Sequence, residues 1–205
     1  MRVTVIDYKA GNLTSVLKAL RHLGAEPEVT DSDLALVAAA ERIVLPGVGH
    51  FQATERLHRT GLTGAIRAAV ARGVPFLGIC VGMQWLYAGS TEAPQQPGLA
   101  AFPEPCTRFS EGKEKVPHVG WNSLDVRPDS RLLAGVQPGA FVYFTHSYKA
   151  PVTADTAAVT TYIEPFASAV ERANIFGTQF HPEKSGETGL KILRNFLAVE
   201  PEAAC

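Results

Sequence analysis

Apolar and polar positions in the first half of the chain follow two periods in turn. Arg2–Asp7 is a short apolar run, which predicts a strand, and the apolar residues after Asn12 recur at helical spacing until Gly24. The alternation continues with strands predicted at Glu26–Thr30, Arg42–Leu45 and Val74–Ile79, and helices capped by Asp31, at Leu62–Arg72 and at Met83–Tyr87. Strands that alternate with helices favour an α/β fold, a mostly parallel central sheet covered by helices on both faces. Ligand sites in such folds lie at the carboxyl ends of the strands.

The second half of the chain changes to strand-like segments with few helices. These segments lie at Cys106–Phe109, Lys115–Val126, Ala140–Tyr148 and Ala157–Ile163. We expect them to form an antiparallel extension. Asn174–Phe180 predicts one more strand, and Glu187–Leu197 predicts an amphipathic helix that turns its leucines inward. No repeat or low-complexity tract divides the chain, so residues 1–205 are expected to form a single domain.

The composition excludes several classes of protein. Of the 205 residues, 46% are hydrophobic and 19% charged, and the net charge of -1 leaves no basic excess for nucleic acid. The longest apolar run, Gly73–Met83, is shorter than the roughly 20 residues that span a membrane, and the N-terminus lacks a signal-peptide pattern. An odd number of widely spaced cysteines, Cys80, Cys106 and Cys205, favours free thiols. We therefore expect a cytoplasmic protein without nucleic-acid or membrane partners.

A cysteine stands between two glycines where a predicted strand turns into a helical segment. The residues Gly78-Ile79-Cys80-Val81-Gly82 have the form of a nucleophile elbow, in which small residues let the helix approach the sheet. A cysteine at such a turn lies at a helix N-terminus, which favours its thiolate. A buried, unreactive cysteine fits the local pattern equally well, so the elbow needs a partner to indicate catalysis.

His181-Pro182-Glu183 supplies that partner after the strand that ends at Phe180. Residues two apart in an extended segment point the same way, so His181 and Glu183 can face one site together. Glu183 could then hold the imidazole while its other nitrogen takes the proton of a thiol. Taken singly, the two residues fit an exposed strand-end histidine and a helix-start carboxylate. Together with the elbow they predict a Cys80-His181-Glu183 triad.

A glycine-rich loop, Pro46-Gly47-Val48-Gly49-His50, follows the strand predicted at Arg42–Leu45. The loop matches the dinucleotide-binding pattern poorly, because Gln52 stands where that pattern has its third glycine. We favour a role in which the backbone N–H groups of Gly47, Val48 and Gly49 stabilise an oxyanion together with that of Val81. No group of His and Cys has metal-ligand spacing, so neither a metal nor another cofactor is expected.

The elbow with Met83-Gln84 after it, the glycine loop and His-Pro-Glu together resemble the class I, triad-type glutamine amidotransferases, whose α/β fold is flavodoxin-like. Four further stretches narrow the resemblance to the glutaminase subunits of imidazole glycerol phosphate synthase in histidine biosynthesis: Asp7–Leu13, Lys115–Asn122, Tyr143–Tyr148 and Gly177–Ser185. The resemblance covers essentially the whole chain. Lys9 departs from it, because many relatives have glycine there.

The resemblance implies roles for these residues. Cys80 would attack the side-chain amide of L-glutamine, His181 would protonate the departing ammonia, and Glu183 would orient the imidazole. Gln84 would contact the bound glutamine, as would groups of His146, Ser147 and Tyr148, although the last segment also fits an edge strand with alternating core positions.

The resemblance also implies a partner. Asn12, Trp121, Tyr143 and Lys184 would line the face through which ammonia passes to a separate cyclase subunit in a heterodimer. Trp121 as an ordinary core aromatic is the competing interpretation. Because the glutaminase fold would use nearly all residues, the acceptor chemistry is expected on another chain. We also expect slow glutamine hydrolysis without that partner. The alternatives are a stand-alone cysteine hydrolase, the glutaminase of another synthase such as pyridoxal phosphate synthase, and a phosphate-binding module.

Overall fold

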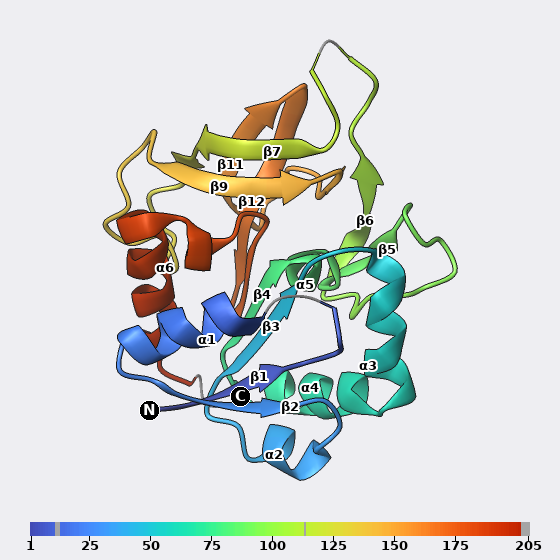
Figure 1. Ribbon diagram of the computed structural model, residues 1–205, viewed down its shortest axis with the longest axis vertical. Coiled ribbons are helices and arrows are strands. Elements are labelled where there is room, and N and C mark those ends of the chain that lie inside the picture. The colour runs from blue at the N-terminus through green and yellow to red at the C-terminus, as the bar shows by residue number, and fades with distance from the viewer. Residues whose placement is uncertain (11–12, 113, 202–205) are drawn as a thin grey trace.

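A computed structural model describes residues 1–10, 13–112 and 114–201. Within these residues the largest sheet has eight strands (Figure 1). In spatial order they are β2 (Glu26–Thr30), β1 (Arg2–Ile6), β3 (Ile43–Gly47), β4 (Phe76–Cys80), β13 (Ile175–Thr178), β12 (Glu164–Arg172), β11 (Thr156–Tyr162) and β8 (Asp125–Val126). The first five pair in parallel and the last three antiparallel. The expected parallel sheet with an antiparallel extension is confirmed.

Helices cover both faces of the parallel part (Figure 1). On one side α1 (Leu13–His22) packs against α6 (Gly186–Ala198), and on the other α2 (Leu34–Ala38) and α3 (Glu55–Arg59) pack against α4 (Leu62–Ala71). The central strands between these layers are completely buried, which is why β3 and β4 read as continuous apolar runs. A short helix, η1 (Phe51–Thr54), precedes α3, and the sequence pattern predicted neither of the two. No helix among the described residues has the length and apolar character needed to cross a membrane.

The N-cap of α2 is Asp33, and the prediction of Asp31 was wrong. The Asp33 side chain accepts a hydrogen bond from the backbone N–H of Leu36 at 3.0 Å. A capping carboxylate must directly precede the first helical residue to reach that N–H group. Asp31 lies two residues too early and instead pairs with Lys9 and Arg56.

The prediction of a helix at Met83–Tyr87 was also wrong in its bounds. The helix after the elbow, α5 (Val81–Gln84), is a single turn, and Tyr87 already begins β5 (Tyr87–Ser90). This strand joins β6 (Phe102–Arg108) and β10 (Tyr148–Lys149) in a second, three-stranded sheet. The backbone of Gly98 lies against this region so closely that a Cβ there would meet the Tyr87 carbonyl at 2.0 Å. Tertiary pairing therefore overrode the local helical pattern.

The sequence pattern missed β12, which returns antiparallel to β11 in a hairpin. Ile163 turns the chain between them at a φ of 60°, a conformation that hairpins usually assign to glycine or asparagine. With a β-branched residue at the turn, the usual hairpin signal is absent.

A third, two-stranded sheet of β7 (His118–Ser123) and β9 (Phe141–His146) lies at one end of the molecule (Figure 1). Its residues alternate between two faces: His118, Phe144 and His146 are buried, whereas Val119, Trp121 and Phe141 are exposed. One face thus packs on the antiparallel strands and the other faces outward.

Candidate active site

Cys80 occupies a strained turn between β4 and α5. Its φ of 54° and ψ of −108° are unusual for a residue with a side chain, and the residue is almost completely buried. The two flanking glycines allow this turn. A Cβ on Gly82 would lie 1.8 Å from the carbonyl oxygen of Leu45 on β3, and one on Gly78 would lie 2.4 Å from the carbonyl oxygen of Gly82. The elbow can therefore form only where both positions lack side chains.

His181 comes to the same edge of the sheet because β13 pairs in parallel with β4. Thr178 lies opposite Ile79, so the residues after β13 leave the sheet beside Cys80. The His181 backbone N–H donates to the carbonyl oxygen of Tyr143 at 2.9 Å, and the Ser185 hydroxyl donates to the carbonyl oxygen of His181 at 2.6 Å. These contacts hold the backbone of the histidine in place.

Glu183 holds the His181 ring from the side away from Cys80. Its Oε1 lies 2.8 Å from Nδ1 of His181, and both side chains are almost fully buried. Among the described residues Nε2 of His181 has no hydrogen-bond partner. Burial lowers the pKa of His181, but the negative charges of Cys80 and Glu183 outweigh it and raise this pKa to about 10. The arrangement stabilises the protonated imidazole of His181 beside Cys80.

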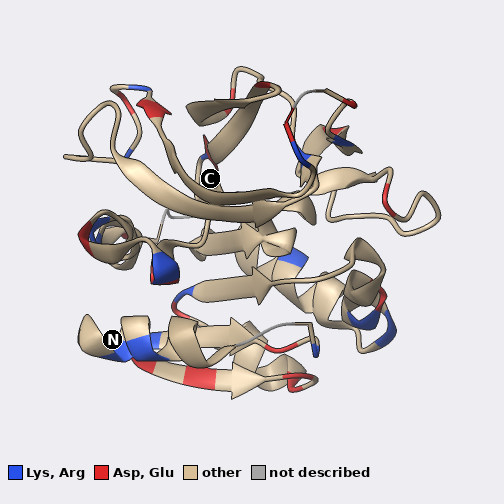
Figure 2. Cartoon of the chain, turned by 45° about the horizontal axis from the view of Figure 1, so that its top comes forward, with Lys and Arg blue, Asp and Glu red and all other residues tan. Residues whose placement is uncertain are grey.

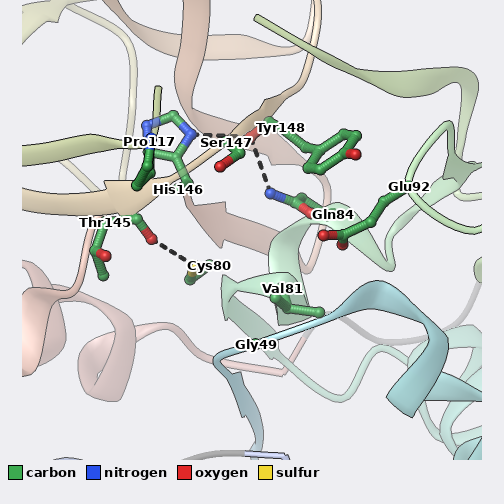
Figure 3. Close-up of a pocket in the computed structure, with 10 residues that line it drawn as sticks. All are labelled: Gly49, Cys80, Val81, Gln84, Glu92, Pro117, Thr145, His146, Ser147 and Tyr148. Atoms are coloured by element: carbon green, nitrogen blue, oxygen red, sulfur yellow. Dashed lines mark hydrogen bonds between the residues drawn. The ribbon is translucent and has the colours of Figure 1, made fainter. Parts of the chain in front are cut away.

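A cavity of about 220 Å³ opens over Cys80. Figure 3 shows the ten residues that line it: Gly49, Cys80, Val81, Gln84, Glu92, Pro117, Thr145, His146, Ser147 and Tyr148. Its volume is below the roughly 300 Å³ at which pockets for drug-sized ligands begin, which suits a small metabolite. Seven of the ten lining residues were predicted from the sequence, while His181 and Glu183 are not part of the lining.

The glycine loop lies beside Cys80, because Gly47 is opposite Cys80 in the pairing of β3 and β4. Gly49 lines the pocket at a φ of 91°, where a glycine is favoured. The N–H group of Val48, however, donates to the carbonyl oxygen of Ala10 at 3.2 Å. In this conformation the Val48 N–H group is used by Ala10 and is not available to an oxyanion formed at Cys80. Gly47 packs under the buried Tyr8 ring, since a Cβ at Gly47 would lie 1.8 Å from the tyrosine hydroxyl.

His146 contributes to the pocket wall, but its ring is engaged elsewhere. Nδ1 lies 2.9 Å from the Tyr148 carbonyl oxygen and Nε2 lies 3.0 Å from Nδ1 of His118. Burial lowers the pKa of His146 to about 3 and that of His118 to about 4. Both rings are therefore neutral at physiological pH and serve as packed polar groups within an aromatic cluster.

Gln84 projects from α5 into the pocket wall. Its side-chain nitrogen donates to the carbonyl oxygen of Tyr148 at 3.0 Å and to Oε1 of Gln179 at 3.1 Å. The side-chain oxygen of Gln84 points away from Tyr148, toward the side on which Glu92 lies (Figure 3). Two acceptors thus occupy the side-chain nitrogen of Gln84, whereas its oxygen is directed elsewhere.

Four residues at the site had no role in the sequence prediction. Glu92, Pro117 and Thr145 line the pocket, and Gln179 donates from its side-chain nitrogen to Cys80 Sγ at 3.6 Å. Gln179 carried a usable signal. It is a polar residue in an apolar strand two positions before His181, so it was bound to face the same side of the chain as the histidine.

Three of the four residues predicted for the partner face lie together. The Trp121 and Tyr143 rings, opposite each other in the β7–β9 sheet, have centroids 6.1 Å apart, and the Lys184 ammonium lies 5.9 Å from the Tyr143 centroid. Trp121 is 56% exposed, which is not a core position. Asn12, the fourth, lies outside the described residues, as does Cys205. Cys106 is fully buried, as expected of a small apolar residue.

The arrangement of these groups suits nucleophilic catalysis by a cysteine. In the described part of the chain, no group of three or more His, Cys, Asp and Glu side chains is placed to hold one.

Comparison with known proteins places this site in a family context. The family model described as glutamine amidotransferase class-I matches residues 4–199. The protein named imidazole glycerol phosphate synthase subunit HisH of Deinococcus radiodurans is 48% identical over 198 residues, covering 95% of this chain and 92% of that protein. A protein of the same name from Chlorobium luteolum is 44% identical, with 95% and 98% covered.

Solved structures agree in fold. A crystal structure described as a glutamine amidotransferase superposes with a TM-score of 0.75 at 19% identity, covering 95% of this chain and 96% of the other. A chain in the structure of PurLQS from Thermotoga maritima gives a TM-score of 0.71 at 22% identity, with 96% and 97% covered.

Proposed function

The chain belongs to the class-I glutamine amidotransferase family, and we propose on that basis that it is the glutaminase subunit of imidazole glycerol phosphate synthase. Relatives with that name are 42–48% identical over nearly their whole length, which supports the assignment. The observation that carries the chemistry is Cys80 at a strained elbow with the His181–Glu183 pair at the neighbouring strand end.

The reaction begins at the sulfur of Cys80. Its thiolate attacks the side-chain amide carbon of glutamine and forms a tetrahedral oxyanion. As this intermediate collapses, the carbon–nitrogen bond breaks, and His181 gives its Nε2 proton to the leaving ammonia. A glutamyl thioester remains on Cys80. His181, now neutral, takes a proton from water, the resulting hydroxide displaces the sulfur, and glutamate leaves.

Glu183 makes this proton transfer directional. Its carboxylate accepts the Nδ1 proton of His181 at 2.8 Å, so the proton that is exchanged is the one at Nε2. The negative charge also stabilises the imidazolium that forms whenever His181 takes up a proton.

The glycine loop and the elbow would stabilise the oxyanion. The N–H group of Val81 begins α5 beside the sulfur, Gly47 lies opposite Cys80 in the strand pairing, and Gly49 lines the pocket. Because the Val48 N–H is bonded to Ala10, this loop must rearrange before it can donate to the substrate. This need for rearrangement supports slow glutamine hydrolysis by the chain alone and faster hydrolysis once partner and acceptor substrate are bound.

The pocket around the sulfur would hold L-glutamine. The side-chain oxygen of Gln84 and polar groups of Ser147 and Tyr148 are available along its wall. His146 would contribute through its backbone, because both of its ring nitrogens are engaged.

The outward face of the β7–β9 sheet would bind the cyclase subunit. Val119, Trp121 and Phe141 are each more than half exposed there. Figure 2 shows the strands of this sheet without acidic or basic residues. An uncharged patch with exposed aromatic residues is typical of a protein interface. Ammonia released at Cys80 would pass to this partner, which forms imidazole glycerol phosphate and aminoimidazole carboxamide ribotide.

We further propose that residues 1–205 form a single amidotransferase domain that acts in the cytoplasm without a cofactor. The family match over residues 4–199 supports one domain, and the free thiols of Cys80 and Cys106 are compatible with a reducing compartment.

The test uses the complex of this chain with its cyclase partner and compares two nitrogen sources. Cys80→Ala should lower glutamine-dependent synthesis by more than about a thousandfold and leave synthesis from ammonium salt intact. Cys106→Ala, which removes the other described thiol, should keep glutamine-dependent synthesis within about twofold of the unmodified protein. Continued use of glutamine by Cys80→Ala would refute the nucleophile, and absence of synthesis from both sources with the unmodified chain would refute the function.

A further inference from the structure

The side-chain amide of Gln179 contacts the nucleophile, although the triad does not include it. Gln179 is completely buried just after β13, and its backbone N–H donates to the carbonyl oxygen of Ser168 at 2.9 Å. Its side-chain nitrogen donates to Cys80 Sγ at 3.6 Å, and its side-chain oxygen accepts from the Gln84 nitrogen at 3.1 Å. The amide of Gln179 thus joins the reacting sulfur to the pocket wall.

These contacts determine how both amides are oriented. The Gln84 nitrogen has two hydrogens and faces two acceptors, the Tyr148 carbonyl oxygen and Oε1 of Gln179. Because Gln179 must offer its oxygen to Gln84, its nitrogen is directed to the sulfur. Turning either amide would bring nitrogen against nitrogen or oxygen against oxygen. The side-chain oxygen of Gln84 is therefore left for the pocket.

We propose that Gln179 has two roles in the reaction: its N–H stabilises the thiolate of Cys80, and its oxygen holds Gln84 so that the Gln84 oxygen faces the substrate. The inference rests on the proposed function, in which Cys80 is the nucleophile. Through the sulfur Gln179 acts on the reacting atom, and through Gln84 it acts as a positioning residue.

The first role follows from the chemistry of the thiolate. A hydrogen bond donated to a charged sulfur favours the charged form over the neutral thiol, and burial strengthens this effect because water cannot replace the donor. The other groups that bear on the sulfur are the Thr145 carbonyl oxygen at 3.9 Å, His181 with Glu183 behind it, and the Tyr8 hydroxyl, whose pKa is raised by burial and by the charge of Cys80. His146 acts on His181 from farther away and is neutral. Gln179 is uncharged, so its contribution is independent of pH.

The two roles can be separated by two substitutions. Gln179→Glu has nearly the same shape and keeps an acceptor for Gln84, but it replaces the donor to the sulfur by a negative charge. Gln179→Leu removes the donor and the acceptor together. Thr178→Val is the matched control, because Thr178 is also fully buried and adjacent, and its hydroxyl has no partner among the described residues.

The primary measurement is the rate at which iodoacetamide alkylates Cys80 between pH 5 and 10, followed on the Cys80 peptide by mass spectrometry in the complex with the cyclase subunit. Gln179→Glu should shift the midpoint of this profile upward by about one pH unit, equivalent to an alkylation rate about tenfold lower below the midpoint. Gln179→Leu should shift it in the same direction and by less. Thr178→Val should leave the profile unchanged.

Steady-state kinetics with glutamine test the second role. Both Gln179 variants should lower kcat, but only Gln179→Leu should raise KM for glutamine, by at least about fivefold, because it alone releases Gln84. An alkylation profile of Gln179→Glu equal to that of the unmodified chain would overturn the thiolate role. Equal KM values for the two variants would overturn the positioning role. Neither outcome depends on the nitrogen-source experiment with Cys80→Ala, so failure of the inference is distinguishable from failure of the function.

Discussion

At the scale of single residues, His181 is placed between two acidic groups in a buried site. Burial alone would keep its imidazole neutral, as it does for His146, but Cys80 and Glu183 reverse this and raise the pKa of His181 to about 10. Two buried histidines of the same site therefore have opposite protonation states. Only the histidine with a carboxylate at 2.8 Å can hold a proton ready for a leaving group.

Removing the carboxylate should lower the pKa of His181. In Glu183→Gln one of the causes that raise this pKa is lost, so the midpoint should fall from about 10 toward the ordinary value near 6.5. Because the imidazolium is the proton donor, glutaminase activity should decline as the pH rises through the midpoint, and this decline should occur at lower pH in the variant. Titration of the ring nitrogens by NMR checks the midpoint, with His146 as the internal reference. An unchanged His181 midpoint would contradict the assigned role of Glu183.

At the scale of elements, the nucleophile depends on how closely α5 crosses the sheet. Gly82 sets this distance, since its Cα faces the Leu45 carbonyl of β3 with no room for a methyl group. Strand β9 is a second element that helps to build the site. The carbonyl oxygen of its Tyr143 accepts from the His181 backbone N–H, and the carbonyl oxygen of its Thr145 lies 3.9 Å from Cys80 Sγ. Phe141 lies on the outward side of the same strand. One strand thus contributes to both the catalytic site and the proposed interface.

Gly82→Ala should strongly destabilise the protein. The new methyl group would meet the backbone carbonyl of Leu45, which cannot move aside as easily as a side chain. We expect the free energy of unfolding to fall by about 1–3 kcal/mol or more, with loss of glutaminase activity. Gly64→Ala is the matched control. Gly64 lies in α4, where a Cβ would meet no atom within 4 Å, so alanine should stabilise that helix by up to about 1 kcal/mol. Urea denaturation measures both, and equal effects of the two substitutions would contradict the close crossing.

At the scale of the whole molecule, the proposed interface and the edge strand β2 lie at opposite ends (Figure 1). The β7–β9 sheet exposes large apolar side chains that contribute nothing to the core of the isolated chain. Their burial against a partner would explain why they are present. Because the Tyr143 carbonyl of β9 also holds the His181 backbone, a partner bound at this sheet would lie next to the proposed catalytic groups.

Trp121→Ala should weaken the complex with the cyclase subunit without unfolding the chain. A central aromatic residue of an interface commonly contributes about 2 kcal/mol or more, so Kd should rise about 30-fold or more. Val29→Thr on β2, which is also exposed, should leave Kd unchanged. Isothermal titration calorimetry measures Kd, and thermal denaturation checks that both variants remain folded. Tight binding by Trp121→Ala would place the interface elsewhere.

The strands of the parallel half and its helices other than η1 and α3, the elbow at Cys80 and the pairing of His181 with Glu183 could be predicted from the sequence alone. These features are local. Apolar periodicity, two glycines around a cysteine, and two polar residues at alternate positions of a strand each act through neighbours in the chain.

Which of these groups meet, and what each can still bind, became known only from the three-dimensional packing. The one-turn length of α5, the hairpin strand β12 and the orientation of the Gln84 and Gln179 amides depend on partners far away in the chain. The same is true of His146, whose ring nitrogens are taken up by His118 and the Tyr148 carbonyl. A polar side chain can be recognised from sequence, but its free donors and acceptors are known only when the packing around it has used the others.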